Sequence, residues 1–289
     1  MSFRPTAKLL AAAVAFTAVP AIAQEAAPSS PPPPVEENIF DGNHVTLGVG
    51  AGYVPSYRGS DDYVISPVPL VRGKYEGIEL NPRLGGVAID VIPDPKDAKV
   101  GITLGPVGTI AFNRKNQIKD EVVKAAGKLD TAVEVGVSGG ITVYRLLNPY
   151  DSLNITTDVK WDVAGAYSGM TYSPMVSYTT PLSKAILTIL SVSARHVDDD
   201  YARYYYSVTP GQSARSGLPV YNAEGGWDTA SVTLLTGYSL AGDMRKGGWA
   251  LFGVANYSKM LNDGKDTPFT SIRGDADQWA FGAGIAYTF

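Results

Sequence analysis

The sequence has two histidines and no cysteine, so few residues could support hydrolysis or thiolate metal binding. His196 is preceded by Ser193 and followed by Asp198-Asp199-Asp200, which are the residue types of a Ser-His-acid hydrolase. Ser193 stands three residues before His196, and an odd spacing along a β-strand places two side chains on opposite faces. We therefore predict no catalytic residue and interpret His196 as a residue at the end of a strand.

The run Asp198-Asp199-Asp200 could alternatively bind Ca²⁺ through carboxylate oxygens. A run of like charges more often marks the solvated start of a loop. We therefore expect no metal ion and no cofactor, and we keep the cation site as the less favoured alternative.

Charged and apolar residues alternate most regularly in the segment 153–167. A period of two indicates a β-strand whose successive side chains point to opposite faces. In a barrel the charged face would line the lumen, where the side chains could either pair and fill it or form a polar path for a solute. The predicted lumen-facing residues are Glu134, Asp158, Lys160 and Asp162, and the predicted outward-facing residues are Leu153, Ile155, Thr157, Val159, Trp161, Val163 and Tyr167.

The last eleven residues, Trp279 to Phe289, carry large side chains at alternate positions with small ones between them. This is the length that a tilted strand needs to cross a bilayer, roughly 9–11 residues. No charged residue follows Asp277, so neither face of this strand is suited to water. We interpret this end of the chain as the signal read by the barrel assembly machinery, and it is carried by Phe281, Ile285, Tyr287 and Phe289.

The same alternation recurs along the chain, and no amphipathic helix is present to cover an apolar face. It predicts an all-β fold, a transmembrane antiparallel up-and-down β-barrel of about twelve strands, with ten as the alternative. The segments 113–130, 197–228 and 261–276 predict long extracellular loops, opposite short periplasmic turns. The predicted strands are 44–54, 64–74, 77–81, 84–92, 100–112, 131–145, 153–167, 171–180, 186–196, 229–240, 248–260 and 279–289.

Several local features refine this prediction. Pro67 and Pro69 predict a bulge or distortion within their strand. The tripeptide 81–83 predicts a turn. The segment 120–127 predicts a short helix with Asp120 as its N-cap and Gly127 as its C-terminal stop. Aromatic residues of the loop 197–228 should fold back over the barrel mouth, because exposing them together would be costly. These residues are Tyr201, Tyr204, Tyr205, Tyr206 and Tyr221.

The N-terminus predicts export. Arg4 and Lys8 precede an apolar run that ends in Ala21-Ile22-Ala23, so residues 1–23 are interpreted as a signal peptide. Residues 24–39 form a proline-rich tail that we expect to be disordered, and residues 40–289 form the barrel. This organisation predicts the outer membrane of a Gram-negative bacterium, with outer-membrane lipid as surroundings. A net charge of −4 without a basic cluster predicts no nucleic-acid partner.

Two loop stretches carry a family resemblance. The first contains Pro55, Tyr57, Gly59, Ser60, Asp61, Asp62 and Tyr63, and the second contains Thr209, Pro210, Ser216, Gly217, Leu218, Pro219 and Tyr221. Together with the last strand, they make residues 40–289 resemble the MipA/OmpV family, the MltA-interacting outer-membrane proteins. The resemblance implies an outer-membrane barrel. In the family's best-known member it also implies a scaffold that links a murein-degrading transglycosylase to a murein synthase.

The sequence is compatible with two functions, and neither is enzymatic. The first is a structural or scaffolding protein linked to the murein (peptidoglycan) synthesis machinery, with murein-modifying enzymes as possible partners. Short turns leave this role little periplasmic surface, although the proline-rich tail could add some. The second is a channel for small solutes, for which the sequence shows no constricting ladder of basic residues.

Overall fold

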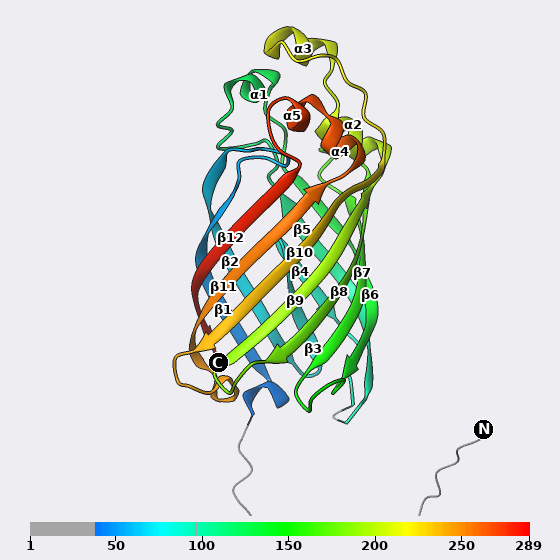
Figure 1. Cartoon of the computed structure of the whole chain (residues 1–289). Coiled ribbons are helices and arrows are strands. Elements are labelled where there is room, and N and C mark those ends of the chain that lie inside the picture. The colour runs from blue at the N-terminus through cyan, green and yellow to red at the C-terminus, as the bar shows by residue number, and fades with distance from the viewer. Residues whose placement is uncertain (1–37, 96) are drawn as a thin grey trace, which may run out of the picture. The chain divides into compact units, whose positions relative to one another are not determined.

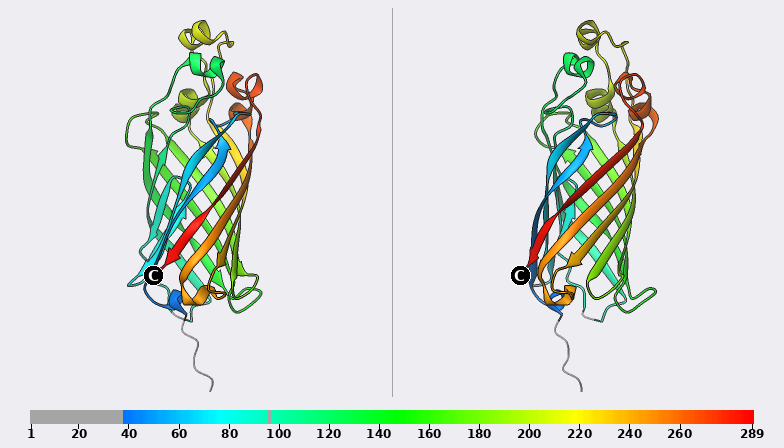
Figure 2. Two further views of the ribbon diagram at one scale, coloured as in Figure 1. Left: turned by 90° about the vertical axis from the view of Figure 1, so that its left-hand side faces the viewer. Right: turned by 60° about the vertical axis from the view of Figure 1, so that its left-hand side comes forward.

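The computed structural model describes residues 38–95 and 97–289; the predicted signal peptide and nearly all of the proline-rich tail lie outside them. Twelve antiparallel strands close into a barrel in which each strand pairs with its neighbours in sequence and β1 pairs with β12 (Figures 1 and 2). The predicted up-and-down barrel and its strand count are confirmed. The strands are β1 (His44–Pro55), β2 (Tyr63–Tyr75), β3 (Ile78–Arg83), β4 (Gly86–Asp90), β5 (Val100–Ala111), β6 (Ala132–Tyr144), β7 (Ser152–Asp162), β8 (Met170–Pro181), β9 (Ile186–Val197), β10 (Gly226–Ser239), β11 (Gly248–Met260) and β12 (Asp277–Thr288).

The closing pair of strands follows from the small residues of the last segment. Gly50 lies opposite Gly284 in the register of β1 and β12. A Cβ atom added at Gly284 would lie 2.4 Å from the backbone oxygen of Val49 and 2.6 Å from Cζ of Phe252, so a side chain has no room there. The large residues of β12 are half exposed on the outer face of the barrel, and the small ones allow the strands and Phe252 to approach on the inner face.

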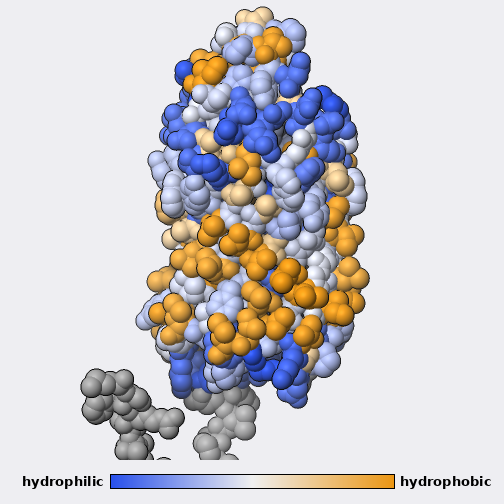
Figure 3. All heavy atoms as spheres, turned by 45° about the vertical axis from the view of Figure 1, so that its right-hand side comes forward, coloured by the Kyte–Doolittle hydropathy of each residue, from blue (hydrophilic) through white to orange (hydrophobic). Residues whose placement is uncertain are grey.

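The outer face of the barrel is apolar. Figure 3 shows hydrophobic side chains gathered in a band, with hydrophilic residues above and below it. Aromatic pairs stand on this face near both ends of the strands, such as Tyr53 stacked on Tyr63 and Trp249 against Tyr287. A closed barrel with an apolar band between aromatic girdles is the architecture of a membrane-spanning sheet. No helix of the described residues combines the length and apolarity needed to cross a bilayer.

The two ends of the barrel differ as predicted. The long loops carry the α-helices at one end, and the short turns lie at the other end with the C-terminus (Figure 1). The helices are η1 (Ile39–Asp41), α1 (Glu121–Ala126), α2 (Asp199–Tyr206), α3 (Pro210–Ser216), η2 (Met244–Lys246), α4 (Asn262–Asp266) and α5 (Pro268–Ser271). The short helix α1 was expected: Asp120 caps its first turn by accepting from the N–H groups of Val122 and Val123, and Gly127 ends it.

Two local predictions are wrong, and a third is confirmed in part. Residues 81–83 belong to β3, and the chain turns after them at Gly85, whose φ of +76° suits glycine. At Pro67 and Pro69 the β1–β2 ladder keeps one register without a bulge, but the predicted distortion is found on the other edge of β2, which pairs with β3 only from Gly73 to Tyr75. The segment 153–167 is a strand only as far as Asp162, so Tyr167 does not face outward.

Candidate functional site: the lumen and its extracellular cap

Two of the charged residues predicted to face the lumen form a buried ion pair. Lys160 Nζ donates to Glu134 and to Thr109 Oγ1, and the latter bond is 2.8 Å long. Glu134 also accepts from Thr109 Oγ1 at 2.7 Å and from the Tyr167 hydroxyl at 2.9 Å. Both carboxylate oxygens of Glu134 therefore have donors, which is the condition under which a buried charge is tolerated.

Asp158 belongs to a second pair. Its Oδ2 accepts from Arg83 Nε at 2.7 Å, and Arg83 Nη2 donates to Ser138 Oγ at 3.2 Å. Arg83 ends β3, whereas Ser138 and Asp158 lie on β6 and β7, so this pair connects the tip of the β3–β4 hairpin to a distant part of the wall. Sequence reasoning missed Arg83 because it read residues 81–83 as a turn. The sequence did contain a pattern that indicates a strand with its polar face toward the lumen, namely polar residues at every second position: Glu79, Asn81 and Arg83.

Asp162 has a different role. Its carboxylate accepts from the backbone N–H groups of Ala164, Tyr167 and Ser168 at 2.8–3.1 Å, and so it organises the loop that follows β7. This loop turns Tyr167 inward, where the hydroxyl reaches Glu134. Of the four predicted lumen residues, Glu134 and Lys160 pair with each other, Asp158 pairs with Arg83, and Asp162 anchors a loop.

A cluster of tyrosines, which we call the aromatic lid, lies above these charges. Tyr201, Tyr205 and Tyr206 on α2 are buried together with Tyr167, in accord with the prediction that the loop aromatics fold back. The ring centroids of Tyr201 and Tyr205 are 4.5 Å apart, and those of Tyr167 and Tyr201 are 4.9 Å apart. Tyr204 is only half buried, and its hydroxyl accepts from Asp130 N–H at 2.8 Å. Burial raises the pKa of Tyr201 and Tyr205 well above the ordinary value, so both hydroxyl groups stay protonated and uncharged.

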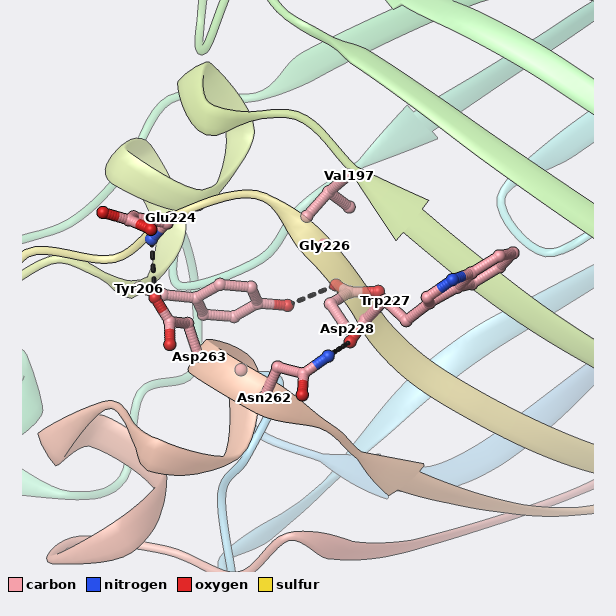
Figure 4. A pocket seen from close by; sticks show the side chains of 9 residues that line it. Val197, Tyr206, Glu224, Gly226, Trp227, Asp228, Asn262 and Asp263 are labelled. Carbon is pink, nitrogen blue, oxygen red and sulfur yellow. Dashed lines mark hydrogen bonds between the residues drawn. The ribbon is translucent and has the colours of Figure 1, made fainter.

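A further ion pair anchors the aromatic lid to the barrel. Arg195 Nε donates to Asp228 at 2.8 Å, and the Tyr206 hydroxyl donates to the same carboxylate at 2.6 Å. Figure 4 shows the Tyr206 hydroxyl pointing toward Asp228 at the wall of a small pocket, near Asn262, whose amide donates to the Trp227 carbonyl at 2.8 Å. The pocket holds about 10 Å³, enough for about one water molecule and too little for a solute.

The two motifs of the family resemblance meet in a second buried cluster, which we call the loop cluster. It contains Tyr57, Ile118, Val123, Ala126, Val208, Leu218 and Phe269, and so joins four extracellular loops. The Tyr57 hydroxyl donates to the carbonyls of Phe269 and Arg273 at 3.1 and 3.0 Å. Burial, reinforced by the Asp120 charge, raises the pKa of Tyr57 and keeps it a donor.

The rest of the first motif shapes its turn. Gly59 has a φ of +91°, and a Cβ atom there would collide with Thr270, 2.1 Å from its Oγ1. Ser60 Oγ lies 3.0 Å from Ser56 Oγ and accepts from Asp62 N–H at 3.1 Å. Pro55 ends β1 opposite Tyr63, and Asp61 is exposed.

The second motif builds α3 and its exit. Thr209 and Gln212 form a capping box, Pro210 occupies the first turn, and Gly217 ends the helix with a φ of +74°. Ser216 Oγ donates to the Gln212 carbonyl at 2.7 Å. Tyr221 exchanges backbone hydrogen bonds with Val208, which returns the chain to the cap, and Pro219 is exposed between them.

One cationic residue of the cap lies against an aromatic ring and a backbone carbonyl. Arg114 is fully buried, with its guanidinium carbon 3.9 Å from the centre of the Phe269 ring, and it donates to the Tyr205 carbonyl at 3.4 Å. Burial lowers the pKa of Arg114 to about 10, because the charged form loses its hydration.

The hydrolase-like residues are not assembled into a site. Ser193 lies on the inner face of β9, whereas His196 is on the outer face against Trp227, with ring centroids 5.4 Å apart. Asp198 caps α2 by accepting from Tyr201 N–H at 2.9 Å, Asp199 accepts from Gly225 N–H at 2.7 Å, and Asp200 pairs with Arg203. Within residues 38–95 and 97–289, no group of three His, Cys, Asp or Glu residues could hold a metal ion.

Comparison with known proteins decides the family. The family model described as MltA-interacting protein MipA matches residues 47–289. The chain belongs to the MipA family. The MltA-interacting proteins of Escherichia coli (strain K12) and Shigella flexneri are each 25% identical to it over 254 residues, which cover 84% of this chain and 90% of theirs.

Solved structures are more distant from this MipA family member. The anion-selective porin from Comamonas acidovorans is 12% identical with a TM-score of 0.35, and covers 86% of this chain and 75% of its own. OmpT of Vibrio cholerae is 8% identical with a TM-score of 0.32, over 86% of this chain and 97% of its own. Similarity at this level does not indicate function. The closed barrel and its apolar band place the chain in the outer membrane of a Gram-negative bacterium.

Proposed function

We propose that this MipA family protein is a non-enzymatic scaffold of the outer membrane that docks a murein-modifying enzyme on its periplasmic end. The E. coli relative is named for its interaction with MltA, and a shared role would require an interaction surface that faces the periplasm. A role in free solute diffusion is less favoured, because ion pairs cross the lumen and packed loops cover its outer end.

A rigid periplasmic turn carries the proposal. In the turn between β6 and β7, Asp151 accepts from the N–H groups of Leu146, Leu147 and Asn148 at 2.7, 2.9 and 3.1 Å and from the Tyr178 hydroxyl at 2.6 Å. These bonds hold Leu147 78% exposed. Tyr150 in the same turn is 71% exposed. A preorganised pair of large apolar side chains is typical of the anchor residues of a protein interface.

The test is binding of a purified MltA-type lytic transglycosylase to the barrel in detergent. We expect Leu147→Ser combined with Tyr150→Ser to weaken binding at least tenfold, because both anchors are lost. The matched control is Leu182→Ser, which removes an exposed leucine from the turn between β8 and β9 and should leave binding unchanged. Wild-type protein that binds no such enzyme would refute the scaffold.

A chain lacking residues 24–38 separates the turn from the tail. If the turn is sufficient, this chain keeps its affinity. If affinity is lost with the tail and kept in the double-serine variant, the docking surface has been assigned to the wrong segment.

We also propose that the barrel assembly machinery reads the alternating large residues at the C-terminal end. Phe289 exchanges backbone hydrogen bonds with Val45 at 2.9 and 3.4 Å, and its ring lies 4.6 Å from that of Tyr287. Deleting Phe289 should slow the appearance of the heat-modifiable form in cells but not in detergent refolding. Equal slowing in both would argue against recognition by the machinery.

A further inference from the structure

The barrel wall has one incompletely paired seam. β1 and β2 pair at every position from His44–Lys74 to Pro55–Tyr63, but β2 and β3 pair only from Gly73–Leu80 to Tyr75–Ile78. Among the described residues, none pairs as a strand with the remaining β3-facing edge of β2, residues 63–72. We call this edge, together with residues 81–85 of the hairpin opposite, the β2–β3 seam.

The direction of the backbone groups at the seam follows from the hydrogen bonds of Val45 and from the strand registers. Val45 exchanges both backbone bonds with Phe289, so odd-numbered residues of β1 point their N–H and C=O groups toward β12 and even-numbered ones toward β2. The β1–β2 register pairs even residues with even residues, so odd-numbered residues of β2 point toward β3. Pro67 and Pro69 are odd-numbered and therefore direct their backbone nitrogens into the seam.

The opposite strand contributes a third proline. Tyr75 pairs with Ile78, so even-numbered residues of β3 point toward β2, and Pro82 is one of them. Because proline has no N–H, three donors that would otherwise face hydrocarbon without a partner are absent. The same prolines prevent the edge from accepting another β-strand, which disfavours pairing with a second chain.

The seam lies within the membrane, and its β2 edge is apolar over most of its length; the charged residue of this edge, Arg72, lies at the periplasmic end on the lumen side. Tyr63 and Tyr75 mark the two ends of β2, and between them Ile65 and Val71 are exposed on the lipid side. On the lumen side Val68 and Leu70 pack over glycines of β1. A Cβ atom added at Gly52 would lie 2.9 Å from Val68 Cγ2, and one added at Gly48 would lie 3.2 Å from Leu70 Cβ.

Two ion pairs hold the hairpin at its two ends. Lys74 on β2 pairs with Glu79 at 3.0 Å beside the short β2–β3 ladder. Arg83 at the end of β3 donates to Asp158 on β7 at 2.7 Å, while β4 pairs with β5 only from Gly86–Thr109 to Ala88–Val107. The adjoining Leu84 is 97% exposed. The tip of the hairpin is thus held by the Arg83–Asp158 pair.

We propose that the β2–β3 seam is a lateral portal through which single apolar chains, such as the acyl chain of a fatty acid or lipid, pass between the lumen and the bilayer, with Arg83–Asp158 as its latch. The largely apolar stretch of β2 between residues 64 and 71 and the missing donors fit a hydrocarbon chain, which needs no hydrogen bonds. The aromatic lid covers the outer end of the lumen, so an apolar molecule would use the side of the barrel.

The test uses a fluorophore attached to single introduced cysteines. Each label has one defined position, because the chain has no native cysteine. Ser66→Cys places the label on the inner face at the seam, Ser231→Cys places it on the inner face of β10, which has strand partners on both sides, and Ile65→Cys reports the lipid face. The barrels are reconstituted in phosphatidylcholine vesicles containing either nitroxide-labelled stearic acid or phospholipid with a nitroxide on its acyl chain.

We expect the label at Ser66 to be quenched at least threefold more than the label at Ser231, and to approach the label at Ile65. Quenching by the free acid alone identifies fatty acids as the chains that enter, and quenching by both probes extends the class to lipid tails. Equal quenching at Ser66 and Ser231 would show that the wall is sealed and would overturn the portal.

The latch is tested in the same vesicles. Asp158→Asn should raise quenching at Ser66 about twofold, whereas Lys160→Gln, which breaks the other lumen ion pair, should not. Arg83→Gln removes the same interaction from the other side and replaces Asp158→Asn if that variant loses its heat-modifiable fold. If the Lys160 variant and the latch variants raise quenching equally, the Arg83–Asp158 pair has no special role.

Discussion

Tyr57 and Leu218 are buried in the same apolar cluster, although they belong to two loop motifs at distant points of the chain. Phe269 of a third loop and Val123 of a fourth complete the contact. The motif residues that identify the family therefore join the extracellular loops to one another, and the hydrogen bonds of Tyr57 fix their spacing.

Disrupting this cluster should loosen the cap and leave the barrel intact. Leu218→Ala should cost about 2–5 kcal/mol of local stability through the cavity it creates. Tyr57→Phe keeps the ring but leaves two carbonyls without a donor, at about 1–3 kcal/mol. Both variants should be cut faster by protease added to whole cells, while the heat-modifiable shift on gels stays unchanged. A barrel that no longer folds would mean that the cluster belongs to the folding core.

The Asp228–Arg195 pair should control access to the lumen. Asp228→Asn leaves the buried guanidinium of Arg195 without its charge partner, which costs about 3–5 kcal/mol, and it removes the anchor of Tyr206. We expect single-channel conductance in planar bilayers to be low for the wild-type protein and to rise for this variant. Asp200→Asn breaks an exposed pair of α2 and should have no effect. High conductance of the wild-type protein would favour the solute channel.

The two faces of β7 should respond oppositely to substitution. Val159→Lys places a charge on the lipid face, at about 2–4 kcal/mol near the midplane, and should block assembly. Lys160→Ala should leave a folded barrel about 3–5 kcal/mol less stable, because Glu134 loses its charge partner but keeps the donors Thr109 and Tyr167. Urea titration of the heat-modifiable form measures both. The opposite ranking would reverse the inside and outside of this strand.

The cap should weaken in acid. Burial alone would raise the pKa of Asp120, but bonds from Arg273 and from the first turn of α1 outweigh it, so the pKa lies below 3.8. A lowered carboxylate pKa contributes stability that is present above pH 3.8 and lost as the pH falls through the folded value. Asp120→Ala should remove this dependence and cost about 1 kcal/mol, whereas Asp120→Asn should keep much of the helix cap. Proteolysis of residues 113–131 as a function of pH is the measurement, and an unchanged acid profile in Asp120→Ala would contradict it.

The strands were predictable because a barrel in lipid turns the period-two pattern into a strict requirement. One face of each strand contacts lipid and the other faces a narrow lumen, so large apolar residues must alternate with small or polar ones. β12 and most of β7 show this alternation. The short helix α1 was predictable for a local reason, since its cap residue and terminating glycine are adjacent in sequence.

The cap and the latch were less predictable because they depend on partners distant in sequence. Arg83 stands in an Asn-Pro-Arg stretch typical of a turn, and only closure of the barrel brings Asp158 within its reach. Helix α2 is rich in tyrosine, which favours strands, and the carboxylate that caps it was read as a solvated charge. Tyr167 turns inward because Asp162 binds the backbone of the loop. A contact of this kind leaves no periodic pattern in the sequence.

The glycines facing one another on β1 and β12 have a mechanical consequence. Here the wall consists of backbone and the ring of Phe252, since Gly50 and Gly284 add no side chain to the interior, whereas the side containing β6 and β7 is braced by Lys160–Glu134 and Arg83–Asp158. When the membrane is under lateral tension, the side of the barrel with the ion pairs should keep its shape, and the side with the glycines should bend. Deformation of the membrane would then change the cross-section of the tube mainly next to β1.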